Sequence, residues 1–271
     1  MKKVLIIGKR GFIGNSLAKY LKNKFTTKHV SFDQFKRKKY IINDFNWVIN
    51  SSINPNYISK KYEIKFDNDV KIAEFITNKK TKYVFLSSRK VYRPNTNIKE
   101  TSKTQPRSNY SKNKLITERR LYKMLNNNLV ILRISNIIGD KTKIKKLHST
   151  FIDIFIKNVK KGFILDNQEN FKDFISIKKF NQIIYYVIKK NLKGLYNLSL
   201  GQKVRLNELI SWLNKKNKKK YIIKKNIIKK NLNLKNENFY LNNKKLMKKL
   251  NIKNSKIELK NYCLNFSKKF F

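Results

Sequence analysis

The segment that most constrains the fold of this chain is residues 4–14, where an apolar run ends in three spaced glycines. Residues 4–7 are of strand type, and Gly8, Gly11 and Gly14 follow at once, with helical periodicity after them. Backbone N–H groups at the start of such a helix face an anion, and glycines leave no side chain in the way. We therefore expect a strand, a phosphate-binding turn and a helix.

An acidic residue downstream strengthens this interpretation. Asp33 lies 19 residues after Gly14 (33 − 14 = 19), close to the spacing of about 20 at which a carboxylate holds the ribose of a dinucleotide. The spacing G-x-x-G-x-x-G differs from the general G-x-G-x-x-G, so an ordinary tight turn is the alternative. The carboxylate favours NAD, because it repels the 2′-phosphate of NADP. Arg10, Lys36 and Arg37 are near enough to leave NADP open.

The following sequence alternates between strand and helix patterns. Strands are expected at residues 29–33, 47–49 and 83–86, and helices at residues 67–78, 151–159, 180–189 and 206–214. Residues 34–46 have no room for a full helix and strand. The alternation predicts an α/β fold, a Rossmann-type doubly wound parallel sheet with a smaller C-terminal substrate-binding lobe. We expect residues 1–139 to form the cofactor-binding core and residues 140–271 the lobe, interleaved with the last core elements.

The composition limits the partners and the location. The formal charge is +49, from 65 Lys and Arg against 16 Asp and Glu, but it is spread along the whole chain. The excess is mostly lysine and accompanies abundant Asn, Ile, Phe and Tyr, as in proteins from A- and T-rich genomes. We therefore do not expect nucleic acid as a partner, although a phosphate-bearing substrate benefits from the field. No apolar run approaches the length of about 18 residues of a membrane span. Cys263 is the only cysteine, which fits the cytoplasm.

A chemical pattern occurs at Tyr110 and Lys114, at the start of a helical segment. Residues four apart share one helix face, and a lysine ammonium beside a phenol stabilises the phenolate. Such a tyrosine can exchange a proton with a hydroxyl or carbonyl while a nicotinamide exchanges the hydride. In a lysine-rich chain this spacing also arises by chance. It becomes informative beside the glycine turn and the pair Ser87 and Ser88, which ends an expected strand.

Six stretches in the right order carry a family resemblance that covers nearly the whole chain. They are GKRGFIG (8–14), FLSSRKVY (85–92), YSKNK (110–114), LRISNIIG (132–139), KDFISI (172–177) and GLYNL (194–198). Together they resemble the extended short-chain dehydrogenase/reductases, the NAD-dependent epimerase/dehydratase family that acts on nucleotide sugars. Residues 163–171 are similar to the loop that closes over the nucleotide in that family.

The resemblance implies a role for individual residues. Tyr110 would transfer the proton, Lys114 would position the nicotinamide ribose, and Ser88 would bond the reacting sugar oxygen. The implied cofactor-binding residues are Gly8, Gly11, Phe12, Ile13, Gly14, Asp33, Ser51, Ser87, Tyr110 and Lys114. The implied substrate-binding residues are Asn136, Lys172 and Arg205, for which a turn residue and solvated surface cations are the alternatives. No metal ligand is expected.

Departures from the family pattern limit which of the family's reactions this protein is expected to catalyse. Arg89 and Lys90 follow Ser88, where the family's sugar 4,6-dehydratases carry Asp and Glu, and Arg89 also replaces the cysteine of members that epimerise carbons beside the ketone. The resemblance therefore implies an NAD-dependent nucleotide-sugar epimerase or keto-sugar reductase. The alternative is a catalytically retired Rossmann protein that binds RNA or anionic surfaces. The sequence leaves a homodimer open.

Overall fold

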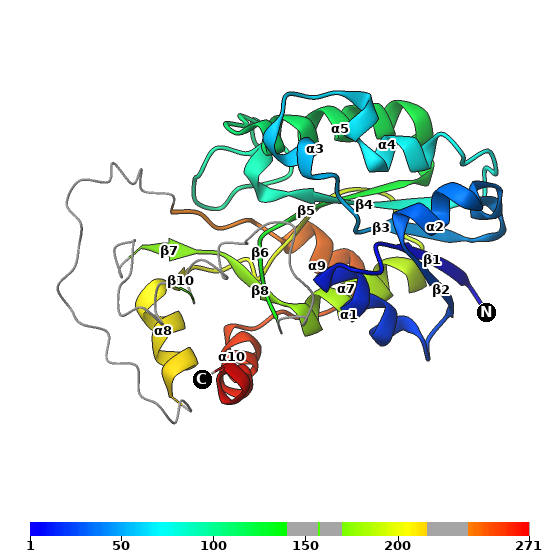
Figure 1. The fold of residues 1–271 in the computed structure, drawn as a ribbon. Coiled ribbons are helices and arrows are strands. Elements are labelled where there is room, and N and C mark those ends of the chain that lie inside the picture. The colour runs from blue at the N-terminus through cyan, green and yellow to red at the C-terminus, as the bar shows by residue number, and fades with distance from the viewer. Residues whose placement is uncertain (140–156, 158–169, 216–237, 271) are drawn as a thin grey trace.

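The computed structural model describes residues 1–139, 157, 170–215 and 238–270, and its centre is a parallel sheet (Figure 1). The order of the six strands is β2-β1-β3-β4-β5-β9, with every neighbouring pair parallel. The strands are β1 (Lys3–Ile7), β2 (Thr26–Val30), β3 (Trp47–Asn50), β4 (Lys82–Ser88), β5 (Leu129–Ile134) and β9 (Gly194–Leu198). The predicted Rossmann-type parallel sheet is confirmed.

Helices cover both faces of this sheet (Figure 1). Successive strand residues point to opposite faces, so the apolar strands contribute side chains to two separate cores, one on each face of the sheet. One core packs under α1 (Phe12–Leu21), α7 (Ile177–Lys189) and α9 (Lys244–Leu250). The other packs under α2 (Phe32–Arg37), α4 (Asn68–Ala73) and α5 (Asn109–Leu125), with α3 (Pro55–Ser59) beside α5. The sheet is therefore doubly wound.

The strand order places a topological switch point between β1 and β3. From β1 the chain crosses to β2 on one side, and it then returns to β3 on the other side of β1. In open α/β sheets, ligands bind at the carboxyl ends of the strands at such a switch point. The residues that follow β1 and β3 are Gly8 and Ser51. Both belong to the expected cofactor-binding set, so the topology places them where a ligand is expected.

The later chain forms a smaller lobe with its own core. Two short sheets pair β6 (Asn136–Ile138) with β8 (Phe174–Ser176) and β7 (Phe171–Lys172) with β10 (Val204–Arg205). A third apolar cluster joins α8 (Leu206–Asn214) to α10 (Lys256–Phe270). Since β9, α7 and α9 return to the central sheet, lobe and core interleave along the chain. The helix expected at residues 151–159 and the loop at residues 163–171 lie almost wholly outside the described residues.

Two predicted elements extend past the residues at which the observed elements end. The strand expected at residues 29–33 is β2, which ends at Val30, because Ser31 caps α2 and forms a capping box with Gln34. The helix expected at residues 67–78 is α4, which ends at Ala73. Beyond it, the Asn43 side chain accepts the N–H groups of residues 77 and 78 and replaces continued helix bonding. As predicted, residues 34–46 hold no strand; beyond α2 they form a 3₁₀ helix, η1 (Lys39–Asp44).

Candidate active site

The glycine turn after β1 is closed by contacts that exclude side chains at two of its three glycines. Gly8 has a φ of +122°, and a Cβ there would lie 2.2 Å from Ser51 Oγ. A Cβ on Gly14 would lie 2.4 Å from the Gly8 carbonyl oxygen. Gly11 is different, because a Cβ there would meet nothing closer than 3.6 Å. Gly11 is also the N-cap of α1, and no side chain caps that helix, so its first turn can receive an anion.

Replacement of Gly14 by alanine is expected to destabilise the turn. The new methyl group would overlap the Gly8 carbonyl, so backbone has to move, at a cost of about 3 kcal/mol of unfolding free energy. Gly11→Ala is the matched control, which should lose less than about 1 kcal/mol but bind NAD more weakly. Urea unfolding of both variants measures the difference. Equal stability of the two variants would contradict the packing described for this turn.

Ser51 holds the end of β3 against this turn. Its N–H donates to the Ile7 carbonyl at 2.8 Å, and its hydroxyl donates to the same oxygen at 3.0 Å. Ser51 thus lies where a small residue is needed beside the glycines. Phe12 and Ile13 open α1 directly after Gly11, so their backbone lies at the same place.

Asp33 lies in the first turn of α2 and not at the end of a strand. Its carboxylate is exposed and pairs with Lys36 Nζ at 2.9 Å and with Arg10 Nη2 at 3.8 Å. The hydrogen bond and charge of Lys36 lower the pKa of Asp33, and Arg10 and Arg37 add to the effect. Arg10 belongs to the glycine turn, so this pair connects Asp33 to the expected pyrophosphate site. Two of the three cations that leave NADP open, Arg10 and Lys36, are therefore in contact with the acid that is expected to favour NAD.

Cofactor preference should depend on this cluster. In Asp33→Asn the repulsion of a 2′-phosphate disappears, while Arg10 and Lys36 remain to bind it. We expect the ratio of the NAD and NADP dissociation constants to move toward NADP by about tenfold, which is about 1.4 kcal/mol. Titration of both cofactors measures the ratio. Asp44→Asn, an exposed acid on η1, is the control and should leave the ratio unchanged. An unchanged ratio in Asp33→Asn would show that Asp33 does not contribute to cofactor binding.

The two serines that end β4 point in different directions. The Ser87 hydroxyl is buried and donates to Glu118 Oε1 at 2.5 Å. Ser88 is half-buried, and its Oγ accepts the Lys90 N–H at 3.2 Å. This follows from the alternation of side chains along a strand. Ser88 is therefore the serine whose side chain is open toward the strand ends, and any cofactor contact of Ser87 has to come from its backbone.

Tyr110 and Lys114 lie on the first turns of α5. Ser108 caps this helix through a capping box with Ser111, which fixes where the helix begins. Tyr110 is half-buried and Lys114 is buried. The Lys114 Nζ lies 4.5 Å from the centre of the Phe85 ring and 3.8 Å from Asp69 Oδ2. It makes no hydrogen bond to any other residue that the structure describes, so its N–H donors can serve a bound molecule.

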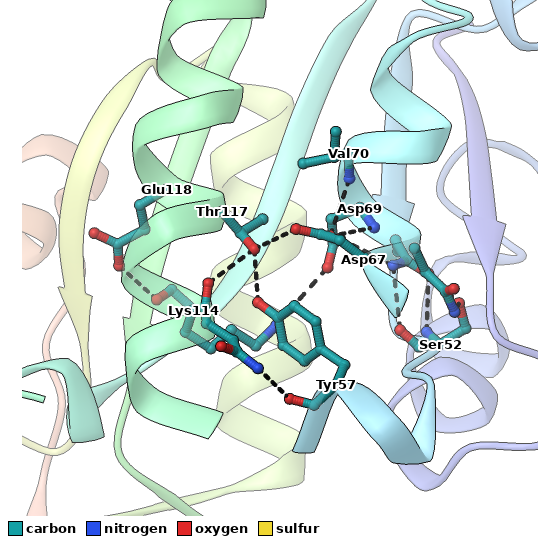
Figure 2. A network of polar contacts seen from close by, with 12 residues as sticks. Ser52, Tyr57, Asp67, Asp69, Val70, Lys114, Thr117 and Glu118 are labelled. Atoms are coloured by element: carbon teal, nitrogen blue, oxygen red, sulfur yellow. Dashed lines mark hydrogen bonds and ion pairs between the residues drawn. The ribbon is translucent and has the colours of Figure 1, made fainter. Parts of the chain in front are cut away.

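The structure surrounds this lysine with a buried polar network that our sequence reasoning missed (Figure 2). Asp69 accepts hydrogen bonds from Asn50 and Tyr83, and Asp67 caps α4. A second missed group joins Glu118 to Arg133. A usable signal for Glu118 is its position four residues after Lys114, on the same helix face. Asp67 shows the ordinary sequence signal of a helix N-cap, and nothing local marks Asp69 as buried.

The expected substrate-binding residues gather in the smaller lobe. Asn136 Nδ2 donates to the Asp173 carbonyl at 3.2 Å, so Asn136 lies beside the residue that follows Lys172. Lys172 is buried in β7, which excludes the solvated surface cation considered for it. Its strand pairs with β10, in which Arg205 is exposed and lies opposite Phe171. The fold therefore brings these three residues to neighbouring strands.

A buried carboxylate organises the same region. Asp173 accepts the backbone N–H groups of Leu200, Gly201 and Leu241 at 3.0, 3.3 and 3.0 Å. Burial raises the pKa of Asp173 to about 7, although these N–H groups and Ser199 oppose the shift. Asp173 thus ties β8 to two segments far away in the sequence, and it supports the strands that carry the expected substrate residues.

The sheet order, the glycine turn at the switch point and the uncapped α1 define a Rossmann-type dinucleotide-binding protein. Residues 39–199 match the NAD dependent epimerase/dehydratase family. The match covers more than half of the chain, including Ser88, Tyr110 and Lys114, and begins after the glycine turn. The protein therefore belongs to the NAD-dependent epimerase/dehydratase family.

Solved structures share this fold over almost their whole length. UDP-glucose 4-epimerase from Thermotoga maritima, with UDP-glucose, has a TM-score of 0.79 and 17% identity, covering 99% of this chain and 98% of that one. dTDP-glucose 4,6-dehydratase from Bacillus anthracis, with NAD, has a TM-score of 0.75 and 17% identity, covering 100% and 96%. UDP-N-acetylglucosamine 4-epimerase from Methanobrevibacter ruminantium has a TM-score of 0.73 and 18% identity, covering 99% and 98%.

Two negative findings complete the comparison. No curated protein sequence matches the chain significantly. In the parts of the chain that the structure describes, no helix combines the length and the apolar character needed to cross a bilayer.

Proposed function

We propose that this protein is an NAD-dependent enzyme that transfers hydride at a carbon of a nucleotide sugar, with Tyr110 as the proton-transfer residue. The observation that carries the proposal is the convergence of three features at one sheet edge. The glycine turn follows β1, Ser51 follows β3 and Ser88 ends β4, and these strands are parallel neighbours. Helix α5 packs against β4 and brings Tyr110 and Lys114 to the same region.

The residues around the glycine turn fit NAD. The turn has no room for a Cβ at Gly8 or Gly14, and the backbone N–H groups at the start of α1 suit a pyrophosphate. The free N–H donors of the buried Lys114 suit ribose hydroxyls. When bound, NAD supplies the acceptor and donor of the hydride. The structural neighbours with bound NAD and UDP-sugars support both ligand classes.

In this proposal each catalytic residue acts on one atom of the sugar. Ser88 bonds the oxygen at the reacting carbon, and Tyr110 takes the hydroxyl proton from that oxygen as the carbon loses its hydride. The Lys114 ammonium, one helical turn after Tyr110 on α5, is the positive charge proposed to act beside the phenol oxygen in this step. In 4-epimerisation the proton on Tyr110 and the hydride would return to the same oxygen and carbon, the hydride on the opposite face. Net reduction of a keto-sugar would use only this second half: the carbonyl carbon would gain a hydride from reduced cofactor, and its oxygen would gain the proton of Tyr110.

The residue after Ser88 argues against dehydration. Arg89 is buried, and its guanidinium lies 3.8 Å from the centre of the Phe239 ring. An arginine keeps its proton at any ordinary pH, so it cannot be the acid or base that removes water from the sugar. This leaves 4-epimerisation and reduction as the two candidate outcomes.

In this proposal the two parts of the chain bind different ligands. Residues 1–139 hold the cofactor and the Ser, Tyr and Lys site, while residues 140–271 supply the substrate contacts of Lys172 and Arg205, with Asn136 at the junction. The lobe has its own apolar core between α8 and α10. A retired protein that binds RNA is not favoured, because the family match includes all three catalytic residues.

A direct assay tests the proposed function. The purified protein is incubated with a panel of UDP- and dTDP-sugars, and the products are separated by chromatography. Turnover without added NADH, with NAD retained through purification, identifies an epimerase, whereas NADH consumption in proportion to product identifies a reductase. If the protein binds neither NAD nor NADP, or leaves every sugar unchanged in both assays, the proposal is refuted.

A further inference from the structure

A buried ion pair joins Lys114 to Asp69, an acid that the proposed reaction does not use (Figure 2). Asp69 Oδ2 on α4 lies 3.8 Å from Lys114 Nζ on α5, and each side chain is 7% exposed. We propose that Asp69 is a positioning residue, which supplies the counter-charge of the Lys114 ammonium and directs it at the cofactor edge of the sheet. The inference rests on the function proposed above and goes beyond the Ser, Tyr and Lys site.

Two uncharged donors hold the Asp69 carboxylate in one orientation. Its Oδ1 accepts Asn50 Nδ2 at 2.9 Å and the Tyr83 hydroxyl at 2.8 Å. Both donors are buried, and both come from strands of the central sheet. With Oδ1 occupied in this way, Oδ2 is the oxygen that faces Lys114. The direction of the negative charge is therefore set by the sheet and not by a mobile surface group.

Asn50, one of these two donors, also connects Asp69 to the loop that lines the glycine turn. Asn50 Oδ1 accepts the N–H of Ser52 at 2.9 Å and its hydroxyl at 2.6 Å. Ser52 follows Ser51, which packs against Gly8. A chain of polar contacts thus runs from the expected pyrophosphate site through Asn50 and Asp69 to the ammonium expected at the ribose. This places the lysine and the cofactor turn in one rigid unit.

The neighbouring acid, Asp67, already has other partners. Its Oδ1 accepts the N–H groups of Asp69 and Val70 at 3.0 and 3.1 Å. Its Oδ2 accepts the hydroxyls of Tyr62 at 3.0 Å and Thr117 at 2.5 Å. Asp67 is therefore satisfied by the start of α4 and by hydroxyl groups. Asp69 is left as the counter-charge that contacts Lys114, which makes Asp67 a natural control.

Among the other titratable groups around the pair, the charge of Asp67 adds to the raised pKa of Asp69, whereas the buried phenols carry no charge. Burial raises the pKa of Tyr57 and of Tyr83, so both phenols stay protonated near neutral pH. Burial also raises the pKa of Tyr62, which donates to Asp67, and Tyr110 adds to the raised pKa of Tyr57. Burial also raises the pKa of Asp69, and the Lys114 charge opposes that effect. Among the described residues, Asp69 is therefore the carboxylate that is in ion-pair contact with Lys114.

The pH dependence of NAD affinity tests the proposal. A buried ammonium without a counter-charge gives up its proton at lower pH, and a neutral lysine is the weaker hydrogen-bond donor. In Asp69→Asn, NAD binding should weaken about tenfold between about pH 7 and about pH 9, as measured by calorimetry. Wild type and Asp67→Asn should change by less than about threefold over this range. The double variant Asp69→Asn/Lys114→Arg should not show the pH dependence of Asp69→Asn, because arginine stays charged.

An Asp69→Asn variant whose NAD affinity varies with pH no more than that of Asp67→Asn would overturn the proposal. A second measurement needs no cofactor, namely urea unfolding of Asp69→Asn, Lys114→Met and the double variant. A double variant that loses clearly less stability than the sum of the single losses supports the pair. If one single variant does not fold, a double variant that does fold supports the pair in the same way. Additive losses would overturn it. If wild type binds no NAD, the proposed function is refuted. The unfolding measurements on the single and double variants would still test whether Asp69 and Lys114 interact.

Discussion

Tyr110→Phe is expected to lower kcat by about 10²- to 10⁴-fold, the range that general acid–base catalysis supplies. The variant loses only the hydroxyl that is proposed to take the proton from the sugar. That hydroxyl makes no hydrogen bond to another residue in the described parts of the chain, so folding should not suffer. NAD affinity should change little, since the turn after β1 and Lys114 are intact. Turnover of the nucleotide sugar found in the panel, with calorimetric NAD binding, measures both effects.

Tyr122→Phe is the matched control for this experiment. Tyr122 lies on the same helix, α5, and its side chain is 61% exposed, so it should keep wild-type turnover and stability. A Tyr110→Phe variant that turns over substrate within about twofold of Tyr122→Phe would exclude Tyr110 as the proton-transfer residue. Lost turnover together with lost NAD binding in Tyr110→Phe would instead indicate damage to the site.

Arg133→Met is expected to cost about 3–5 kcal/mol of unfolding free energy, because it leaves a buried carboxylate without its counter-charge. Arg133 Nη2 lies 2.6 Å from Glu118 Oε2, and the two side chains are only 6% and 5% exposed. Arg133 also donates to the Tyr92 hydroxyl at 2.8 Å. Urea unfolding measures the loss. The Ser87 hydroxyl donates to the same Glu118, so the end of β4 should loosen as well.

The double variant Arg133→Met/Glu118→Gln separates charge burial from packing. With both charges removed, glutamine can still accept the Ser87 hydroxyl, and much of the lost stability should return. If the double variant is as unstable as Arg133→Met, lost packing and not an unpaired charge explains the effect. A loss below about 1 kcal/mol in Arg133→Met would contradict the importance of the pair.

Much of the fold could be predicted because the relevant signals are local. The apolar residues before Gly8 form β1, and the helix expected at residues 206–214 is α8 with the same bounds. The YSKNK stretch begins α5 because Ser108 caps it. In each case the strand or helix is specified by residues next to one another in the chain, which periodicity and capping rules can use.

The errors arise where a local signal competed with another. The expected strand at residues 29–33 overlooked the capping box of Ser31 and Gln34, which begins α2 and puts Asp33 on a helix. The expected helix at residues 67–78 ends early because Asn43, from an earlier segment, takes over the next backbone N–H groups. The first error could have been avoided from the sequence. The second could not, because its cause is a contact between distant segments.

By itself, the sequence determined the glycine turn, the alternation of strands and helices and the family motifs, since each depends on neighbouring residue types. Only the tertiary structure decided which charges are buried and which partner each one has. Asp69 meets Lys114, and Glu118 meets Arg133, because separate helices and strands pack on the same sheet. Burial removes water from these groups and makes their charges interact strongly, and it is a property of the packed fold rather than of any short stretch of the chain.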